Sequence, residues 1–219
     1  MPAPTAWRFR PTGRGWRSRR PQPNLHPKDP VDDFDVYLKD LVTGALTLAS
    51  LSASGEKRVG LFGSLGARLS ADGRRVGFHS DAPGLHPSDT DETADVFVRD
   101  LVSGELILVS TNDAGVKGNG QSTGPSLSSD GAKVAFASYA TNFDLQVTTN
   151  GSVALYMKDL ATGDLSLVST NAAGEVIRGG LSNPSMSADA TRIAFDSSSS
   201  NAHPADTDSV ADVCSSKMS

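Results

Sequence analysis

Short runs of aspartate are the residues of this sequence best suited to chemistry. The stretch Asp-Thr-Asp-Glu-Thr-Ala-Asp, residues 89–95, places carboxylates at the first, third and seventh positions of one loop. Calcium binds about six to eight oxygen ligands, many of them carboxylates, so this spacing could gather three ligands around one ion. The candidate metal ligands are the aspartates of this loop and of a matching run at 206–212: Asp89, Asp91, Asp95, Asp206, Asp208 and Asp212.

The same aspartates can also be explained as turn residues. The loop lacks the glycine and the bidentate glutamate of an EF-hand calcium loop, and three carboxylates fall short of a full ligand set. Asp and Asn stabilise turns through side-chain to backbone hydrogen bonds, and Asp95 would anchor the strand that follows. A less regular run contains Asp29, Asp32, Asp33 and Asp35. Each loop is therefore expected to be either a calcium site or a polar turn, and no other cofactor is predicted.

Three of the four histidines stand at one place relative to these loops. His26, His86 and His203 each precede a proline and lie three residues before the first aspartate of a run. Together with aspartate, histidine could bind a transition metal, but no further residue of metal-ligand type stands nearby. We expect each histidine to pack, partly buried, beneath its loop.

One catalytic motif has a partial match. Gly-Gln-Ser-Thr-Gly, residues 120–124, fits the G-x-S-x-G nucleophile elbow, in which a strand precedes the serine and a helix follows it. Ser122 is followed instead by Pro125 and a predicted strand. We therefore expect no catalytic serine here, and no catalytic residue elsewhere in the chain.

These loops belong to a sequence that repeats itself about every 59 residues, the kind of period found in solenoids and propellers. One block occurs three times, as DVYLKDLVTGALTLAS from residue 35, DVFVRDLVSGELILVS from 95 and ALYMKDLATGDLSLVS from 154. A second block alternates with it, as LSADGRRVGF from 69, LSSDGAKVAF from 127 and MSADATRIAF from 186.

Each period predicts a four-stranded antiparallel unit. Segments such as 95–101 and 134–138 are short, rich in Val and Phe, and apolar on both faces in places, as in strands packed between neighbouring sheets. Asp-Gly pairs at 72–73 and 130–131 predict tight hairpin turns. The long Gly/Asn/Ser-rich segment at 110–128 should cross the surface to the next unit. Because no segment combines a helical apolar period with helix caps, the predicted fold class is all-β.

In combination, the two blocks and the aspartate loop resemble the TolB-type, WD-like β-propeller repeat of many bacterial exported proteins. The resemblance covers about residues 25–213 and rests on P-S-L-S-x-D-G-x-x-V-A-F-x-S, a D-T-D-rich loop and D-V-F-V-R-D-L-x-S-G-x-x-x-L-V-S. It implies a partial β-propeller of four-stranded antiparallel blades that acts as a binding platform, and a periplasmic or extracellular location. The chain departs from the pattern at Ala190, which replaces a turn glycine, and at 148–154, where the third aspartate loop has become TTNGSVA.

The number of repeats is small for a propeller, which closes with about four to eight blades. We expect a fragment of a longer protein, with about three blades and a truncated fourth in residues 25–219. Residues 1–24 carry six arginines and no acid, and form an expected disordered basic tail. Blade faces without neighbours expose apolar surface, so self-association through these faces is also expected.

Composition excludes several classes of function. The 219 residues hold 20 Lys and Arg against 25 Asp and Glu, and the six arginines of the tail leave the remainder more acidic still, which argues against nucleic acid as a partner of the folded part. No apolar run is long enough to cross a membrane, and the N-terminus lacks the apolar segment of a secretory signal. Cys214 is the single cysteine and cannot form an internal disulfide.

These observations predict a non-enzymatic propeller module whose surface binds a protein or a carbohydrate, with calcium as the candidate ligand of the aspartate loops. The alternative is the propeller portion of a larger, oligopeptidase-like hydrolase whose catalytic domain lies outside this chain.

Overall fold

β-Strands are the regular structure of this chain. The computed structural model describes residues 26–29, 33–143, 152–177, 179–203 and 205, and the backbone of 212–217. Thirteen strands lie within these residues, and none of the described residues forms a helix, so no membrane-crossing helix is found among them. The all-β fold class predicted from the sequence is confirmed.

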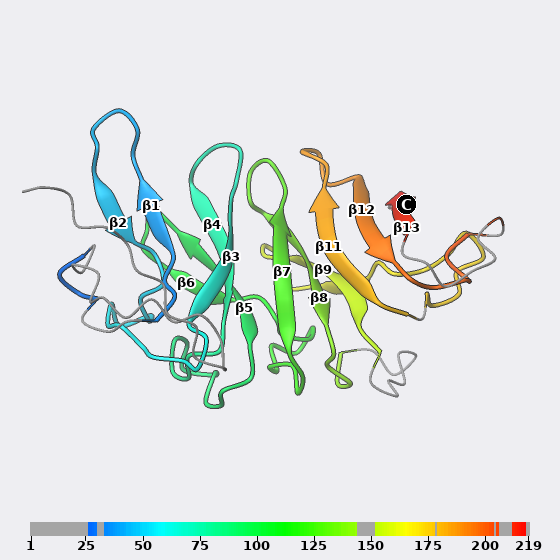
Figure 1. Cartoon of the computed structure of the whole chain (residues 1–219), viewed down its shortest axis with the longest axis horizontal. Coiled ribbons are helices and arrows are strands. Elements are labelled where there is room, and N and C mark those ends of the chain that lie inside the picture. The colour runs from blue at the N-terminus through cyan, green and yellow to red at the C-terminus, as the bar shows by residue number, and fades with distance from the viewer. Residues whose placement is uncertain are drawn as a thin grey trace, which may run out of the picture.

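The strands form four antiparallel sheets that follow one another along the chain in a curved row (Figure 1). We call these sheets blades 1 to 4. Within the described residues, two blades have four strands each in simple sequential order, whereas blade 1 has two strands and blade 4 has three. Blade 1 contains β1 (Tyr37–Lys39) and β2 (Leu46–Leu48); blade 2 contains β3 (Ser64–Leu69), β4 (Arg75–Ser80), β5 (Asp95–Asp100) and β6 (Leu106–Leu108); blade 3 contains β7 (Ser122–Leu127), β8 (Lys133–Ser138), β9 (Ala154–Asp159) and β10 (Leu165–Leu167); blade 4 contains β11 (Leu181–Met186), β12 (Arg192–Ser197) and β13 (Asp212–Lys217).

Turn glycines close the first hairpin of each complete blade where the Asp-Gly pairs predicted them. Gly73 and Gly131 have φ values of 71° and 66°, which glycine adopts without steric cost. Ala190 occupies the same turn in blade 4 and keeps the left-handed conformation, with φ 56°. The departure from the repeat pattern therefore leaves the turn in place and strains its backbone.

The first strand of blades 2, 3 and 4 carries a bulge at one conserved place in the repeat. Its pairing with the second strand shifts register there, for example between Thr123 and Ser126 in blade 3. A bulge of this kind bends the strand and increases its twist. The left-handed residues at the bulges are Gly66, Gly124 and Asn183, with φ values of 68°, 66° and 52°.

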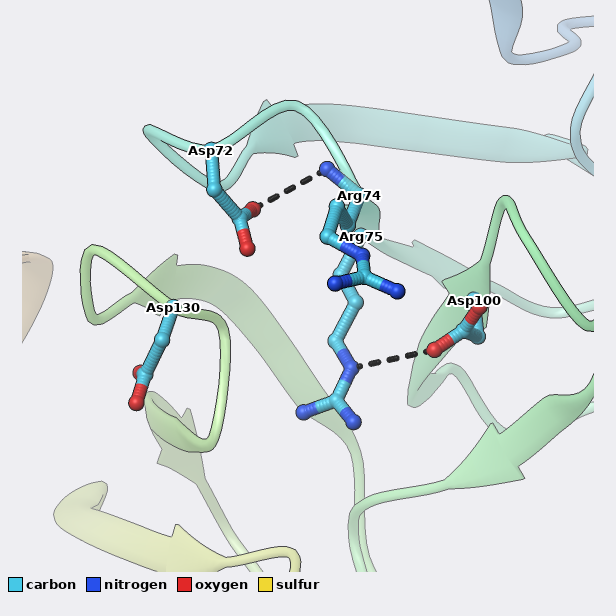
Figure 2. A pocket seen from close by; sticks show the side chains of 5 residues that line it. All are labelled: Asp72, Arg74, Arg75, Asp100 and Asp130. Atoms are coloured by element: carbon cyan, nitrogen blue, oxygen red, sulfur yellow. Dashed lines mark hydrogen bonds and ion pairs between the residues drawn. The ribbon is translucent and has the colours of Figure 1, made fainter.

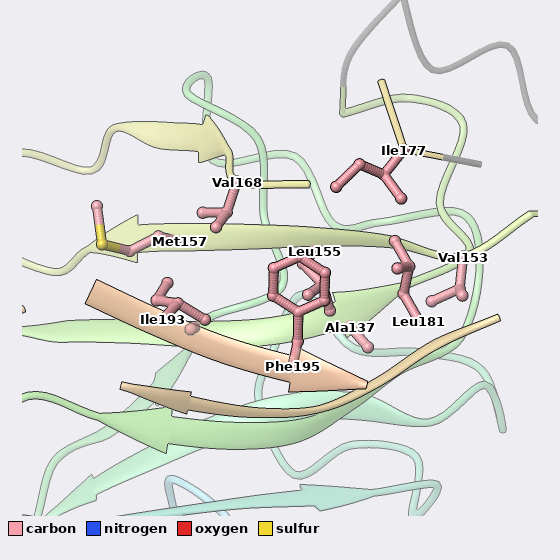
Figure 3. Packing of buried hydrophobic residues seen from close by; sticks show 10 residues of the cluster. Ala137, Val153, Leu155, Met157, Val168, Ile177, Leu181, Ile193 and Phe195 are labelled. Atoms are coloured by element: carbon pink, nitrogen blue, oxygen red, sulfur yellow. The ribbon is translucent and has the colours of Figure 1, made fainter. Parts of the chain in front are cut away.

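The core lies between the blades. Leu155 and Met157 on β9 of blade 3 pack with Ile193 and Phe195 on β12 of blade 4 (Figure 3). Similar clusters join blade 1 to blade 2 and blade 2 to blade 3. Each blade thus buries its faces only against its neighbours, as expected of a repeat architecture.

Buried cations also connect successive blades. Arg99, on the third strand of blade 2, donates from Nε to the carbonyl oxygen of Ala49 at 3.1 Å, in the segment that follows blade 1. Lys158, at the same place in blade 3, donates from Nζ to the carbonyl oxygens of Thr111 and Asn112 at 3.1 and 3.0 Å. Burial lowers the pKa of both side chains, and the carbonyl oxygens replace their lost hydration. These bonds fix blade 2 to blade 1 and blade 3 to blade 2.

Candidate functional site

The predicted aspartates of blade 2 meet at one end of the blade. Asp89 and Asp91 lie in the loop between β4 and β5, and Asp95 is the first residue of β5. One carboxylate oxygen from each lies within 4.8 Å of those of the other two. Asp89 and Asp95 are 1% and 0% exposed, whereas Asp91 reaches solvent. The sequence spacing therefore brings three carboxylates together, two of them buried.

A lysine that the sequence analysis did not select lies among these carboxylates. Lys117 comes from the segment that links blade 2 to blade 3, and its Nζ lies 2.8 Å from Asp95 Oδ2 and 3.0 Å from Asp91 Oδ2. The lysine side chain is 11% exposed, so this is a largely buried ion pair. The positive charge of Lys117 partly neutralises the loop from within the chain.

Asp95 has a partner at each carboxylate oxygen, Ser110 at Oδ1 and the Lys117 ammonium at Oδ2, whereas Asp89 is less well satisfied. Ser110 Oγ donates to Asp95 Oδ1 at 2.6 Å and accepts the backbone N–H of Val96 at 3.2 Å. Asp89 Oδ1 is buried and has no hydrogen-bond partner among the described residues. A buried carboxylate oxygen in that position favours either a proton or a cation.

Burial and neighbouring charges shift the pKa values of Asp89, Asp95 and Lys117. Burial, with the negative charge of Asp95 adding to it, raises the pKa of Asp89 to about 7. Burial also raises the pKa of Asp95, although hydrogen bonds from Lys117 and Ser110 oppose the rise. Burial by itself would lower the pKa of Lys117, but its bonds to Asp95 and Asp91 outweigh burial and raise it. The ammonium therefore stays charged, and Asp89 is the group that takes up a proton near neutral pH.

Blade 1 repeats the arrangement. One carboxylate oxygen each from Asp29, Asp33 and Asp35 lie within 4.8 Å of one another. Lys57 Nζ lies 2.7 Å from both Asp33 Oδ1 and Asp35 Oδ2, and the hydroxyl of Tyr37 donates to Asp29 Oδ2. Blades 1 and 2 thus share one arrangement, in which a lysine from the following segment partly neutralises an aspartate loop.

Blade 3 carries neither of the paired charges. Ala154 begins its third strand where Asp95 begins that of blade 2. Val176 bridges to Thr170 as Lys117 bridges to Thr111. Because the aspartate and the lysine are replaced together by apolar residues, they behave as one unit of the repeat.

The second predicted aspartate run cannot be compared in the same way. Asp206 and Asp208 lie outside the described residues, and Asp212 is described only as the first backbone position of β13. The metal-ligand prediction for these three residues stays a prediction.

The cluster in blade 2 can bind a proton, and its capacity for a metal is constrained by the lysine. Lys117 Nζ already contacts Asp91 and Asp95, so calcium would have to displace an ammonium group before it could use all three carboxylates. Asp89 Oδ1 is the oxygen left over for such an ion. Calcium at Asp89, Asp91 and Asp95 likewise remains a prediction.

A charged hollow lies at the opposite, hairpin-turn end of the blades (Figure 2). Arg75 spans it, donating from Nε to Asp100 Oδ2 at 3.4 Å and from Nη1 to the carbonyl oxygen of Gly131 at 3.1 Å in blade 3. Arg75 therefore joins two blades, and its charge is partly used within the protein. The hollow has a volume of about 300 Å³ and is lined by Asp72, Arg74, Arg75, Asp100 and Asp130.

Comparisons with known proteins give similarity in fold and little similarity in sequence. No family model matches the sequence, and no curated protein matches it. A structure described as TolB from Agrobacterium tumefaciens is 21% identical, with 61% of this chain and 40% of that one covered at a TM-score of 0.39. An oligogalacturonate lyase from Vibrio parahaemolyticus is 16% identical over 82% of this chain and 45% of that one, with a TM-score of 0.45. The β-propeller domain of the Trilobed protease from Pyrococcus furiosus is 13% identical over 62% of this chain and 34% of that one, with a TM-score of 0.36.

The chain spans less than half the length of each of these structures, and at such identities the likeness concerns the fold alone. The architecture is decided by the chain's own sheets. They are antiparallel, reach four strands and, within the described residues, pack against the sheets before and after them. The chain is a partial β-propeller. The β-propeller fold that the TolB-type resemblance implied is thereby confirmed.

Three of the four histidines have a local structural role. His26 and His86 are partly buried as expected, whereas His203 is exposed. His86 Nδ1 accepts the backbone N–H of Ser88 at 3.2 Å, and His26 Nδ1 accepts that of Lys28 at the same distance. His203 Nδ1 accepts the N–H of Ala205 at 3.1 Å. Each imidazole therefore shapes the turn that leads into its aspartate loop, and no histidine joins the carboxylate clusters found among the described residues.

The serine of the elbow-like motif is a structural residue of the propeller. Ser122 begins β7, is fully buried, and shares a hydrogen bond of 2.9 Å with Ser138 Oγ on the neighbouring strand. Ser64 and Ser80 make the same contact at 3.0 Å in blade 2. The repetition gives Ser122 a structural reason to stand at this place in the blade.

Proposed function

We propose that this chain is a non-enzymatic propeller module that binds a protein or a carbohydrate through one end of its blades. We call this end the loop face: it carries the long loop between the second and third strands of each blade and the segments that link successive blades. The opposite end, with the short hairpin turns, is the turn face. Large apolar side chains exposed on the loop face carry the proposal: Phe34, Val59, Leu61, Phe62, Val116 and Tyr139.

The most prominent of these side chains belong to the segment that links blades 1 and 2. Leu61 and Phe62 are 76% and 65% exposed. The carboxylate of Asp81 accepts the backbone N–H groups of Phe62 and Gly63 at 2.8 and 2.9 Å, and Phe34 bridges to Gly63 from the neighbouring blade. Aromatic side chains such as that of Phe62 are enriched at binding interfaces. Because the backbone beneath them is already held in place, binding would cost less conformational entropy.

Binding should be tested with defined probes. The wild-type chain and the double variant Leu61→Ser/Phe62→Ser are compared on a glycan array and against a phage-displayed peptide library. We expect selected ligands to bind the variant at least about tenfold more weakly, as for truncation of an interface hot spot. Val102→Ser, an equally exposed apolar residue on the turn face, is the control and should bind as the wild type does.

Two results would contradict the proposal. Equal loss of binding in Val102→Ser would show that the loop face is not the binding surface. Conversion of a bound glycan or peptide to a product by the wild-type chain, followed by mass spectrometry, would show an enzyme and not a binding module.

Calcium at the aspartate loops is part of the same proposal. The buried carboxylates of Asp89 and Asp95 and the unpartnered Asp89 Oδ1 support it, and the ammonium of Lys117 competes with it. A bound ion would stabilise the loop face without taking part in a reaction. A periplasmic or extracellular location, which the TolB-type resemblance implies, is proposed as well and is testable by fractionation of cells that express the full gene.

A further inference from the structure

Among the described residues, blade 1 lacks contacts that the complete blades make at the turn face. In blades 2 and 3, the leucine after the third strand is partly buried and donates its N–H to the preceding hairpin of the same blade: Leu101 to Arg74 at 2.8 Å and Leu160 to Ala132 at 2.9 Å. Leu41, the matching residue of blade 1, is 92% exposed, and its N–H has no acceptor among the described residues. Among the described residues β1 pairs with β2 alone, and this unpaired edge of β1 leaves Leu41 exposed.

Lys39 at the end of β1 and Asp40 just after it make no contact with another blade among the described residues. Asp100 of blade 2 pairs with Arg75 at 3.4 Å, and Asp159 of blade 3 pairs with Lys133 at 3.8 Å. Asp40, the matching residue of blade 1, makes no ion pair among the described residues and uses Oδ1 only to accept backbone N–H groups of its own turn. Within the described part of the chain, Lys39, which matches the blade-connecting Arg99, donates to the carbonyl oxygen of Gly44 in that turn and to no other blade.

Blade 4 offers the missing half. Its strands β11 and β12 form a first hairpin in which Arg192 and Phe195 stand where blade 2 has Arg75 and Phe78. The strand paired with β12 in this chain is β13, and its register puts Lys217 opposite Arg192 and Cys214 opposite Phe195. In blade 2 those places hold Asp100 and Phe97, whose ring stacks on Phe78 at 5.7 Å.

The residue types of β13 are therefore poorly matched to β12, because like charges on directly opposite positions are destabilising. In the register of blades 2 and 3, β1 would place Asp40 opposite Arg192 and Tyr37 opposite Phe195. Lys39 would then reach the backbone of the segment that follows blade 3, as Lys158 reaches that of the segment after blade 2.

We propose that a second copy of this chain supplies the missing hairpin: β1 and β2 of one copy pair with β12 of the other in place of β13, and form a complete four-stranded blade. Without β13 the described strands number twelve, which makes three blades of four. Two copies joined head to tail at both ends then close a ring of six blades, within the range of about four to eight that propellers use. This is a strand exchange of the kind that produces symmetric dimers at little cost.

The experiment uses two charge reversals in the full chain, followed by light scattering coupled to size-exclusion chromatography. The wild type should elute with twice the 22.8 kDa mass of one chain. Asp40→Arg and Arg192→Asp should each be monomeric at concentrations where the wild type is a dimer, because like charges then meet at both junctions. A mixture of the two variants should recover the dimer, because every junction of the mixed dimer joins opposite charges.

Controls separate this interface from other surfaces and from misfolding. Glu105→Arg makes the same change of charge on the turn face of blade 2, away from the proposed junction, and should leave the dimer intact. Leu41→Asp alters a side chain that is 92% exposed in the single chain, so it should not disturb folding, yet it should weaken dimerisation at least about tenfold. A monomeric wild type, a mixture that stays monomeric, or an effect of Glu105→Arg equal to that of Asp40→Arg would each overturn the proposal.

Discussion

Replacing Lys117 by valine should destabilise the propeller strongly unless Asp95 is replaced with it. The side chains of this pair are 11% and 0% exposed, and Nζ lies 2.8 Å from Asp95 Oδ2. Removing one partner of a buried ion pair leaves an unpaired buried charge and costs about 3–5 kcal/mol. With a urea dependence of about 2 kcal/mol per molar, the midpoint of unfolding should fall by roughly 1.5–2.5 M.

The double variant Asp95→Ala/Lys117→Val copies the apolar pair that blade 3 carries at the same places, Ala154 and Val176. Apolar replacement of a whole buried ion pair is often neutral or stabilising, so the double variant should lie within about 1 kcal/mol of the wild type. Asp95→Ala alone leaves Lys117 with Asp91 and should cost about 1–3 kcal/mol. The free energies of unfolding of the two single variants should therefore be non-additive by about 3 kcal/mol or more.

Urea unfolding of the wild type, both single variants and the double variant, followed by circular dichroism, measures this coupling. Lys133→Val is the matched control, because Lys133 pairs with Asp159 at 3.8 Å and its side chain is 40% exposed. An exposed pair of this kind contributes less than about 1 kcal/mol. Additive free energies in the double variant, or a cost for Lys117→Val no greater than for Lys133→Val, would refute the view that Asp95 and Lys117 form one unit.

Three further predictions concern the turns and the aspartate loop. Ala190→Gly should raise the free energy of unfolding by roughly 0.5–1 kcal/mol, because Ala190 has a φ of 56°, which glycine adopts without strain. Ala188→Gly, at a turn residue without positive φ, is the control and should lower the free energy of unfolding. Thermal melts compare the two variants. The pKa of Asp89 is about 7 in the folded chain against 3.8 for an ordinary aspartate, so the folded state binds more protons than the unfolded state between these two pH values. The free energy of unfolding should therefore fall as pH rises through this window, by up to roughly 4 kcal/mol. In Asp89→Asn the urea midpoint should no longer depend on pH in this way. Millimolar Ca²⁺ should raise the melting temperature and Mg²⁺ should not, with a larger calcium shift in Lys117→Gln, where no ammonium competes; no shift in either protein would leave only the turn explanation of the loop.

The elements that depend on neighbours in sequence could be predicted from sequence alone. Gly73 and Gly131 mark hairpin turns because a positive φ is a local requirement that few residues meet. Asp89, Asp91 and Asp95 lie together because one short loop carries all three. Ala190 shows the limit of local rules, since the packing of blade 4 holds an alanine in a conformation that its own preference disfavours.

Sequence spacing did not indicate Lys117, because the hairpin of β5 and β6 and part of the linking segment separate it from the aspartate loop. A signal was nevertheless present: Lys57 and Lys117 occupy one phase of the repeat, and Val176 replaces them in the copy where Ala154 replaces the aspartate. Comparing what changes together between copies would have found the pair. The sequence repeat also predicts the order of the strands along the chain. It does not show which strand of the repeat begins each sheet, so the two-stranded blade 1 is known only from the structure.

The hydrogen bond from Leu101 N–H to the carbonyl oxygen of Arg74 joins the two hairpins of blade 2, the outer one (β5 and β6) to the inner one (β3 and β4). Leu160 makes the same bond to Ala132 in blade 3. A pulling force applied along the chain would have to break this hydrogen bond before it could separate the outer strands one at a time. Each full blade should then rupture as one mechanical unit. Releasing about 59 residues at roughly 3.4 Å each would lengthen a tethered molecule in steps of about 20 nm.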